Sequence, residues 1–189
     1  ARLQGVDFAG MLDSPDFGFT RPFDAEFGKM MVRTASHLLG GDACGRFAFV
    51  ECVELSVLLE PRAVAGRWKD ANDLQAYLLG LATSRISLLV GDEALFAIRL
   101  HAFPKSDLAV SYFVWRRQEA AQTALDRFCT YVLGREKQRP DTVTAILQGL
   151  GDEEKIEILR QNGVEYGGVP AWQRQGTAVF LRSGAERGT

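Results

Sequence analysis

The sequence offers little that could cross a bilayer, form a disulfide framework or hold zinc. Its most apolar stretch, Tyr77–Val90, is interrupted by Arg85, so no run approaches the ~20 apolar residues of a membrane-spanning helix. Residues 1–15 lack a basic start and an apolar stretch, which argues against a secretory signal. The three cysteines form no Cys-x-x-Cys pair, and His37 and His101 lie far apart. We therefore expect reduced thiols and a cytoplasmic protein with no membrane partner.

Neither a strong charge excess nor a common nucleotide-binding or hydrolase motif is present. The chain carries 22 Lys and Arg against 24 Asp and Glu, so its charge does not indicate a nucleic-acid partner. The sequence contains no Gly-x-x-x-x-Gly-Lys-Ser/Thr, Gly-x-Gly-x-x-Gly, His-Glu-x-x-His or Gly-x-Ser-x-Gly motif. With 189 residues, of which 47% are hydrophobic, the chain can form one substantial core without metal or disulfide support.

Hydrophobic spacing predicts an alternation of strands and helices. Apolar and β-branched residues alternate over Phe47–Leu59, which predicts a hairpin with a turn near Glu51 and Cys52. The acidic residues Glu51 and Glu54 then read either as solvent-facing hairpin positions or as functional groups. Helical spacing or strand composition marks further segments, and we expect strands at 1–4, 96–103 and 177–182 and helices at 23–39, 69–89, 106–133, 141–150 and 152–161.

This order, β-α-β-β-α-β-α-α-α-β, predicts an α+β fold with a mainly antiparallel sheet and helices on one face. Its first six elements match the split ferredoxin-like arrangement that polymerase palms use. We expect one palm-like domain over residues 1–189, with a helical C-terminal extension over about 106–189. The sequence has no internal repeat and no low-complexity tract that would indicate a different organisation.

Several motifs, in order along nearly the whole chain, resemble those of the tRNA-histidine guanylyltransferase family. The most specific is the segment 155–177, which resembles Lys-x-Glu-Leu/Ile-Leu, Gly-x-x-Phe/Tyr and Pro-x-Trp-x-Arg-x-Gly. Upstream, 115–120 is similar to Trp-Arg-Gln-x-Asp-Ala, 2–8 to Arg-Leu-Asp-Gly-Arg-x-Phe, 19–22 to Phe-x-Lys-Pro and 52–56 to Ser-Asp-Glu-x-Ser. The resemblance is strongest to the bacterial guanylyltransferase-like branch, of which this chain would be a divergent member.

The resemblance implies a palm that adds nucleotides in the 3′-to-5′ direction to the 5′ end of tRNA, with Mg²⁺ and with GTP or ATP as substrate. A homo-oligomer, either a dimer or a tetramer, is implied as well. The family pattern places RNA contacts at Trp115 and Arg116. It places contacts to the nucleotide at Arg2, Gly5, Phe8, Arg21, Cys52 and Lys155. The His-x-Asn-Asn stretch of eukaryotic members is replaced by Ala121-Gln122-Thr123-Ala124, which argues against strict specificity for tRNA-histidine.

The resemblance breaks at the catalytic positions. Where the family has its two metal-binding aspartates, this chain has Gln4 and Val53, and only Glu54 and the backbone carbonyl of Gly5 match the family's site. Mg²⁺ prefers hard oxygen ligands, chiefly carboxylates and phosphates, so ordinary two-metal catalysis is not expected. Asp7, Glu54 or Glu51 could supply a replacement carboxylate. The alternative is a catalytically inactive palm that binds nucleotide, RNA or a protein partner.

Overall fold

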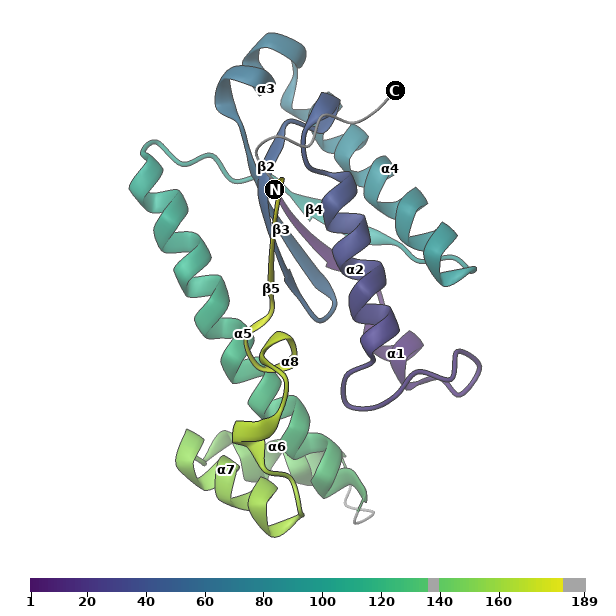
Figure 1. The fold of residues 1–189 in the computed structure, drawn as a ribbon, viewed down its shortest axis with the longest axis vertical. Coiled ribbons are helices and arrows are strands. Elements are labelled where there is room, and N and C mark those ends of the chain that lie inside the picture. Colours follow the sequence, from purple (N-terminus) through teal and green to yellow (C-terminus); the bar gives the residue numbers. More distant parts are fainter. Residues whose placement is uncertain (136–139, 182–189) are drawn as a thin grey trace.

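The computed structural model describes residues 1–135 and 140–181, which form an antiparallel sheet of five strands in the order β4-β1-β3-β2-β5 (Figure 1). The strands are β1 (Arg2–Gly5), β2 (Gly45–Glu51), β3 (Glu54–Leu59), β4 (Phe96–Arg99) and β5 (Thr177–Phe180). The helices are α1 (Phe8–Asp13), α2 (Ala25–His37), α3 (Pro61–Arg67), α4 (Ala71–Val90), α5 (Ser106–Arg135), α6 (Pro140–Gln148), α7 (Asp152–Gln161) and α8 (Ala171–Gln175), with short 3₁₀ turns at Gly41–Ala43 and Tyr166–Gly168.

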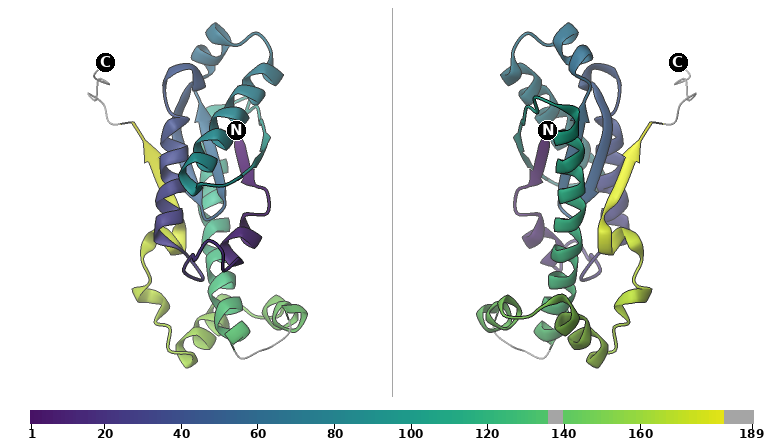
Figure 2. Two further views of the ribbon diagram at one scale, coloured as in Figure 1. Left: turned by 90° about the vertical axis from the view of Figure 1, so that its right-hand side faces the viewer. Right: turned by 90° about the vertical axis from the view of Figure 1, so that its left-hand side faces the viewer.

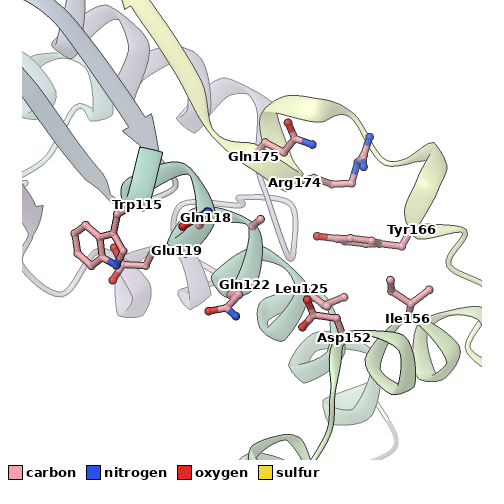
Figure 3. Close-up of a pocket in the computed structure, with 11 residues that line it drawn as sticks. Trp115, Gln118, Glu119, Gln122, Leu125, Asp152, Ile156, Tyr166, Arg174 and Gln175 are labelled. Atoms are coloured by element: carbon pink, nitrogen blue, oxygen red, sulfur yellow. The ribbon is translucent and has the colours of Figure 1, made fainter. Parts of the chain in front are cut away.

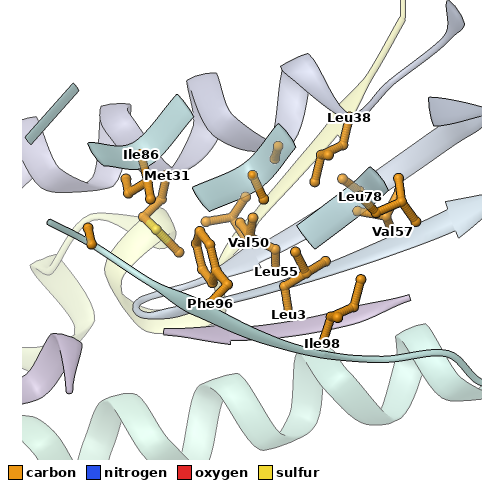
Figure 4. Packing of buried hydrophobic residues seen from close by; sticks show 14 of the residues in the cluster. Leu3, Met31, Leu38, Val50, Leu55, Val57, Leu78, Ile86, Phe96 and Ile98 are labelled. Atoms are coloured by element: carbon orange, nitrogen blue, oxygen red, sulfur yellow. The ribbon is translucent and has the colours of Figure 1, made fainter. Parts of the chain in front are cut away.

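One face of the sheet forms the main hydrophobic core against α2 and α4. Leu3 in β1 lies opposite Leu55 in β3 and Ile98 in β4, and register partners in an antiparallel sheet point to the same side. These residues pack with Met31 of α2 and Leu78 of α4 (Figure 4). The strands at the centre of the sheet are therefore fixed in register by the apolar side chains of this face.

The opposite face of the sheet lies against the first half of α5 (Figure 2). Aromatic and polar side chains make this contact. The ring of Phe47 in β2 packs edge-on to that of Phe113 in α5, with centroids 4.9 Å apart. The hydroxyl groups of Ser56 in β3 and Tyr112 in α5 lie 2.9 Å apart. The second half of α5 packs instead on α6 and α7, around a separate cluster that includes Phe128, Val132 and Leu159.

The predicted fold class is confirmed, since the strand order is that of the split ferredoxin-like arrangement with β5 added beside β2. Helices α2 and α4 cover one face as expected, and α5 adds a helix on the other face. The sequence analysis missed three short helices, α1, α3 and α8, because segments of five to seven residues carry too little periodicity to recognise. The expected strand at 177–182 begins at Thr177, and Arg182 lies outside the described residues. No helix among the described residues is long and apolar enough to span a membrane.

We predict that Gly5→Ala destabilises the protein by about 1–3 kcal/mol, because a Cβ at this position would lie 2.2 Å from Cδ2 of the buried Phe8 ring. The matched control is Gly66→Ala in α3, where a Cβ meets nothing within 4 Å and helix propensity should raise stability slightly. Urea unfolding of both variants measures the difference. Equal stabilities for the two variants would contradict the close packing of Phe8 beneath Gly5.

Candidate functional site

The end of β1 and the turn between β2 and β3 meet at one edge of the sheet. The backbone N–H of Gly5 donates to the carbonyl of Val53 at 2.9 Å, and Gln4 is the register partner of Glu54. The turn itself requires a positive φ of 39° at Cys52. The fold therefore brings Gln4, Gly5 and Val53, where the resemblance places the metal ligands, next to Glu54.

These positions do not provide a site for a pair of divalent cations. Gln4 is exposed and offers only an amide oxygen, while Val53 offers no side-chain donor. Asp7 begins α1, and a Cβ built on Gly10 would lie 2.5 Å from its Oδ1, so this carboxylate rests on the first turn of that helix. Among residues 1–135 and 140–181, no group of three or more His, Cys, Asp or Glu side chains is placed to hold a metal ion.

The retained acidic residue, Glu54, is held by two arginines instead. Its Oε2 accepts hydrogen bonds from Nε of Arg2 and from Nη2 of Arg116, each at 2.8 Å. Nη2 of Arg116 also donates to Oε2 of Glu51 at 2.8 Å, and its Nη1 bonds to Glu119 one turn further along α5. We call these five residues, Arg2, Glu51, Glu54, Arg116 and Glu119, the arginine–glutamate cluster.

Burial and charge make the arginine–glutamate cluster an unusual environment. The side chain of Arg116 is only 1% exposed, and those of Glu51 and Glu54 are 11% and 15% exposed. Three carboxylates share two guanidinium groups, so one negative charge lacks a compensating positive charge. The pKa of Glu51 is raised to about 7, chiefly because burial disfavours its charged form; Arg116 opposes the shift, and the neighbouring Glu54 and Glu119 add to it. Glu51 is the most buried of the three carboxylates, and a pKa of about 7 means that it is partly protonated at neutral pH.

The cluster corrects two interpretations of the sequence. Glu51 and Glu54 are not solvent-facing hairpin positions, because both bind a buried guanidinium. Arg116 is buried in ion pairs with carboxylates, so its guanidinium is not placed to contact RNA as the resemblance implied. Trp115 keeps 44% of its surface exposed, and the guanidiniums of Arg2 and Arg116 lie 5.8 Å and 5.7 Å from its ring centroid.

The expected nucleotide contacts are divided among several places. Phe8 is 1% exposed and packs on Phe96, so its ring is a core residue in this structure and does not offer a face to a base. Arg21 is exposed in the loop before α2, where it pairs with Asp13. Lys155 belongs to α7 at the far end of α5 (Figure 1) and is bound to Asp126 at 2.6 Å. Arg2, Gly5 and Cys52, in contrast, all lie at or beside the turn between β2 and β3.

Cys52 faces a small cavity of about 30 Å³ that Phe27, Trp172 and Thr177 also line. Burial raises the pKa of its thiol, and the nearby carboxylates Glu51 and Glu54 add to this effect against the opposing charge of Arg127. The side chain is therefore a neutral thiol at physiological pH. A neutral thiol is a weak hydrogen-bond donor, so it is a poor replacement for a hydroxyl that binds phosphate.

A larger cavity of about 700 Å³ opens between α5 and the segment that contains α7 and α8 (Figure 3). Sequence reasoning did not find this cavity, because it is formed by residues from distant segments. Trp115 lies at one end, and the hydroxyl of Tyr166 points between Arg174 and Leu125 (Figure 3). The amide side chains of Gln118, Gln122 and Gln175 line it as well. Its volume falls within the usual range of small-molecule cavities, and its walls combine aromatic and amide groups with the charged side chains of Glu119, Asp152 and Arg174.

The comparison with known proteins gives similarity over nearly the whole chain. No family model matches the chain. It is 29% identical to tRNA(His) guanylyltransferase 1 of Arabidopsis thaliana over 99% of its length, and 24% identical to tRNA(His) guanylyltransferase 2 of that organism over 95%. These alignments cover 34% and 35% of the two relatives, so the chain spans about a third of the length of the curated relatives it matches.

Solved structures with the same fold carry similar names. The tRNA(His) guanylyltransferase of Saccharomyces cerevisiae superposes with a TM-score of 0.81, at 23% identity, over 95% of this chain and 83% of that one. A bacterial tRNA(His) guanylyltransferase-like protein in complex with ATP superposes with a TM-score of 0.75, at 18% identity, over 96% of this chain and 78% of that one. The corresponding complex with GTP gives 0.70 at 18% identity, over 95% and 72% of the two chains.

We predict that the protein loses stability as the pH rises from 5.5 to 7, because the pKa of Glu51 is about 7 when folded against 4.5 when unfolded. A raised folded pKa stabilises below the unfolded value, and this gain is lost as the pH rises through the folded value, here by about 1.5 kcal/mol over this window. Urea unfolding at both pH values measures the loss. Glu51→Gln removes this component, while other titrating groups contribute equally to both proteins. An identical pH dependence of the two proteins would show that Glu51 does not titrate as inferred.

We also predict that Arg116→Met lowers the free energy of unfolding at pH 7 by about 3–5 kcal/mol, because it leaves buried carboxylates without their guanidinium. The neighbouring Arg117→Met is the control, since Arg117 is exposed and its bond is to the amide of Gln175. The loss caused by Arg116→Met should be smaller at pH 5.5, where Glu51 is neutral. A loss below 1 kcal/mol at pH 7 would contradict the central role of Arg116.

Proposed function

Because the chain is a divergent member of the tRNA(His) guanylyltransferase family, we propose that it is a nucleotide-binding palm that does not itself carry out metal-dependent nucleotidyl transfer. One observation carries this proposal. The acidic residue that the chain keeps at the family's site, Glu54, is already bound by Arg2 and Arg116, and the two positions of the family's aspartates hold Gln4 and Val53.

The electrostatic argument concerns the stabilisation of charge. In two-metal phosphoryl transfer, two divalent cations offset the negative charge that develops on the attacking and leaving oxygens, and carboxylates hold those cations in place. Here the side chains at the corresponding positions bring no free negative charge. Oε2 of Glu54 already accepts hydrogen bonds from Arg2 and Arg116, so a cation would have to displace a guanidinium to bind this oxygen. The residues present do not fit a pair of Mg²⁺ ions.

The binding part of the proposal has separate support. The structures with the same fold include complexes of bacterial guanylyltransferase-like proteins with ATP and with GTP, which makes a nucleoside triphosphate the ligand to test first. Two residues of the family's pattern contact the β2–β3 turn: Arg2 binds Glu54, and the backbone N–H of Gly5 donates to the carbonyl of Val53. The names of the curated relatives make tRNA the RNA partner to test, and self-association of the chain stays a prediction from the resemblance.

A second candidate is a 3′-to-5′ nucleotidyltransferase with an altered metal site. It is favoured by the position of Asp7, an exposed carboxylate two residues after Gly5 at the start of α1. The side chain would have to leave the first turn of α1 to reach the position beside Gly5. This candidate retains the family's use of GTP or ATP and of Mg²⁺, and it is separated from the first by whether catalysis occurs.

The test measures binding and catalysis on the same protein. We expect GTP or ATP to raise the melting temperature in EDTA, since a ligand that binds only the folded state stabilises it. We expect no nucleotide addition to 5′-activated tRNA in the presence of Mg²⁺. The double variant Gln4→Asp, Val53→Asp is the comparison, and in it Mg²⁺ should strengthen nucleotide binding.

Each arm has an outcome that decides between the candidates. Mg²⁺-dependent addition by the unmodified chain would replace the first candidate with the second, and loss of that addition in Asp7→Asn would identify the replacement ligand. A melting temperature that neither nucleotide changes, with or without Mg²⁺, would remove nucleotide binding from the proposal.

A further inference from the structure

Strand β5 forms one edge of the sheet. Among the strands that the structure describes, β5 pairs only with β2, and it lies at the outer side of the sheet (Figure 2). The free edge of a strand is a template for a further strand, and proteins usually protect it with a charge, a proline or a bulge. The β5 edge has none of these, since Thr177–Leu181 contains no charged residue and no proline, and the register of β5 with β2 runs without a shift.

The opposite edge of the sheet, β4, shows the usual protection. Its four residues include the exposed Arg99, whereas all four residues of β5 are uncharged. A strand that paired with β4 would have to accommodate this charged side chain beside its own backbone. Of the two edges of the described sheet, β5 is therefore the one that is open to pairing.

Exposed apolar side chains continue from the β5 edge onto α5. Phe180 is 66% exposed and is the register partner of Phe47, whose ring packs on α5, so both rings point to the face that carries this helix. Val110 of α5 is 64% exposed. It lies two helical turns before Arg117, whose hydrogen bond to Gln175 marks the side of α5 that faces β5. A strand added at β5 would cover Phe180 and approach Val110.

We propose that β5 pairs with β5 of a second copy of this chain, so that the two sheets form one continuous sheet. Two identical strands related by a twofold axis perpendicular to the sheet are antiparallel, and each satisfies the free backbone groups of the other. A pairing centred on Val179 places the small Ala178 opposite the large Phe180 of the partner subunit, on the face that carries α5. An uncharged strand of this kind is complementary to itself, and the twofold pairing closes after two copies.

The inference goes beyond the proposed function, because it concerns a contact between protein chains and no nucleotide. It assigns a surface to self-association, which the sequence motifs do not. Four paired residues bury less area than the roughly 800 Å² per partner of a standard interface, even with Phe180 and Val110 beside them. We therefore expect a weak dimer with a dissociation constant of about 1–50 µM.

The test introduces the same substitution at the two edges. Ala178→Lys in β5 and Ala97→Lys in β4 are matched, since both alanines are exposed and both point to the face that carries α5. Sedimentation velocity over a range of concentrations measures the dissociation constant. We expect the unmodified chain to dimerise, Ala178→Lys to weaken the dimer about tenfold or more, and Ala97→Lys to leave it unchanged. Equal melting temperatures of the three proteins at concentrations where all are monomeric separate the contact from the fold.

A mixture of two variants tests which residues face each other. In the proposed pairing, Lys at position 178 of one copy lies opposite Glu at position 180 of the other when Ala178→Lys is mixed with Phe180→Glu. The mixed dimer should therefore be about two- to five-fold tighter than the dimer of either variant alone. A mixture without this gain would overturn the pairing centred on Val179.

Two other results would overturn the inference as a whole. One is an unmodified chain that stays monomeric at about 0.5 mM, far above the expected dissociation constant. The other is a dimer that Ala97→Lys weakens as much as Ala178→Lys does. Neither result bears on nucleotide binding, so the proposed function would stand or fall by its own experiment.

Discussion

The buried guanidinium of Arg116 is the contact on which the arrangement around the candidate site depends. It joins α5 to the β2–β3 turn through Glu51 and Glu54, and it is almost completely removed from water. A charge in such a place is costly unless carboxylates surround it, and the carboxylates are costly without it. The same contact that positions α5 on the sheet therefore also decides that the acidic groups at the turn face an arginine.

This contact also explains which half of α5 belongs to which part of the molecule. The first half of the helix meets the sheet through Tyr112, Phe113 and Arg116, whereas the second half packs on α6 and α7 around Phe128 and Val132. The large cavity lies where the two parts meet (Figure 3). Its walls come from α5 and from residues 152–175, so its shape depends on the ionic contact that holds α5 to the sheet.

The fold could be predicted from the sequence further than the site could. Alternation over Phe47–Leu59 and helical spacing in the longer helices identify the sheet and its order because one face of each element is apolar. Local pattern does not predict the burial of Glu51 and Arg116, because a charged residue considered alone is expected at the surface. The two residues are 65 positions apart in the sequence. Only their pairing makes burial favourable, and local pattern carries no information about a partner that distant. The expected nucleotide contact at Phe8 is wrong for a related reason, since a motif match does not say whether a ring faces a ligand or the core.

The neutral residues at positions 4 and 53 and the two arginines at Glu54 form a single electrostatic arrangement. Aspartates at both positions would add two negative charges beside a cluster in which three carboxylates already share two guanidiniums. Without a bound cation, five carboxylates would then face two positive charges, and burial would make that excess more costly. Neutral side chains at positions 4 and 53 therefore avoid a larger excess of negative charge in this cluster. The neutral side chains at positions 4 and 53 and the pairing of Glu54 with two arginines therefore support each other physically, because either change alone would leave the cluster with a larger excess of one charge.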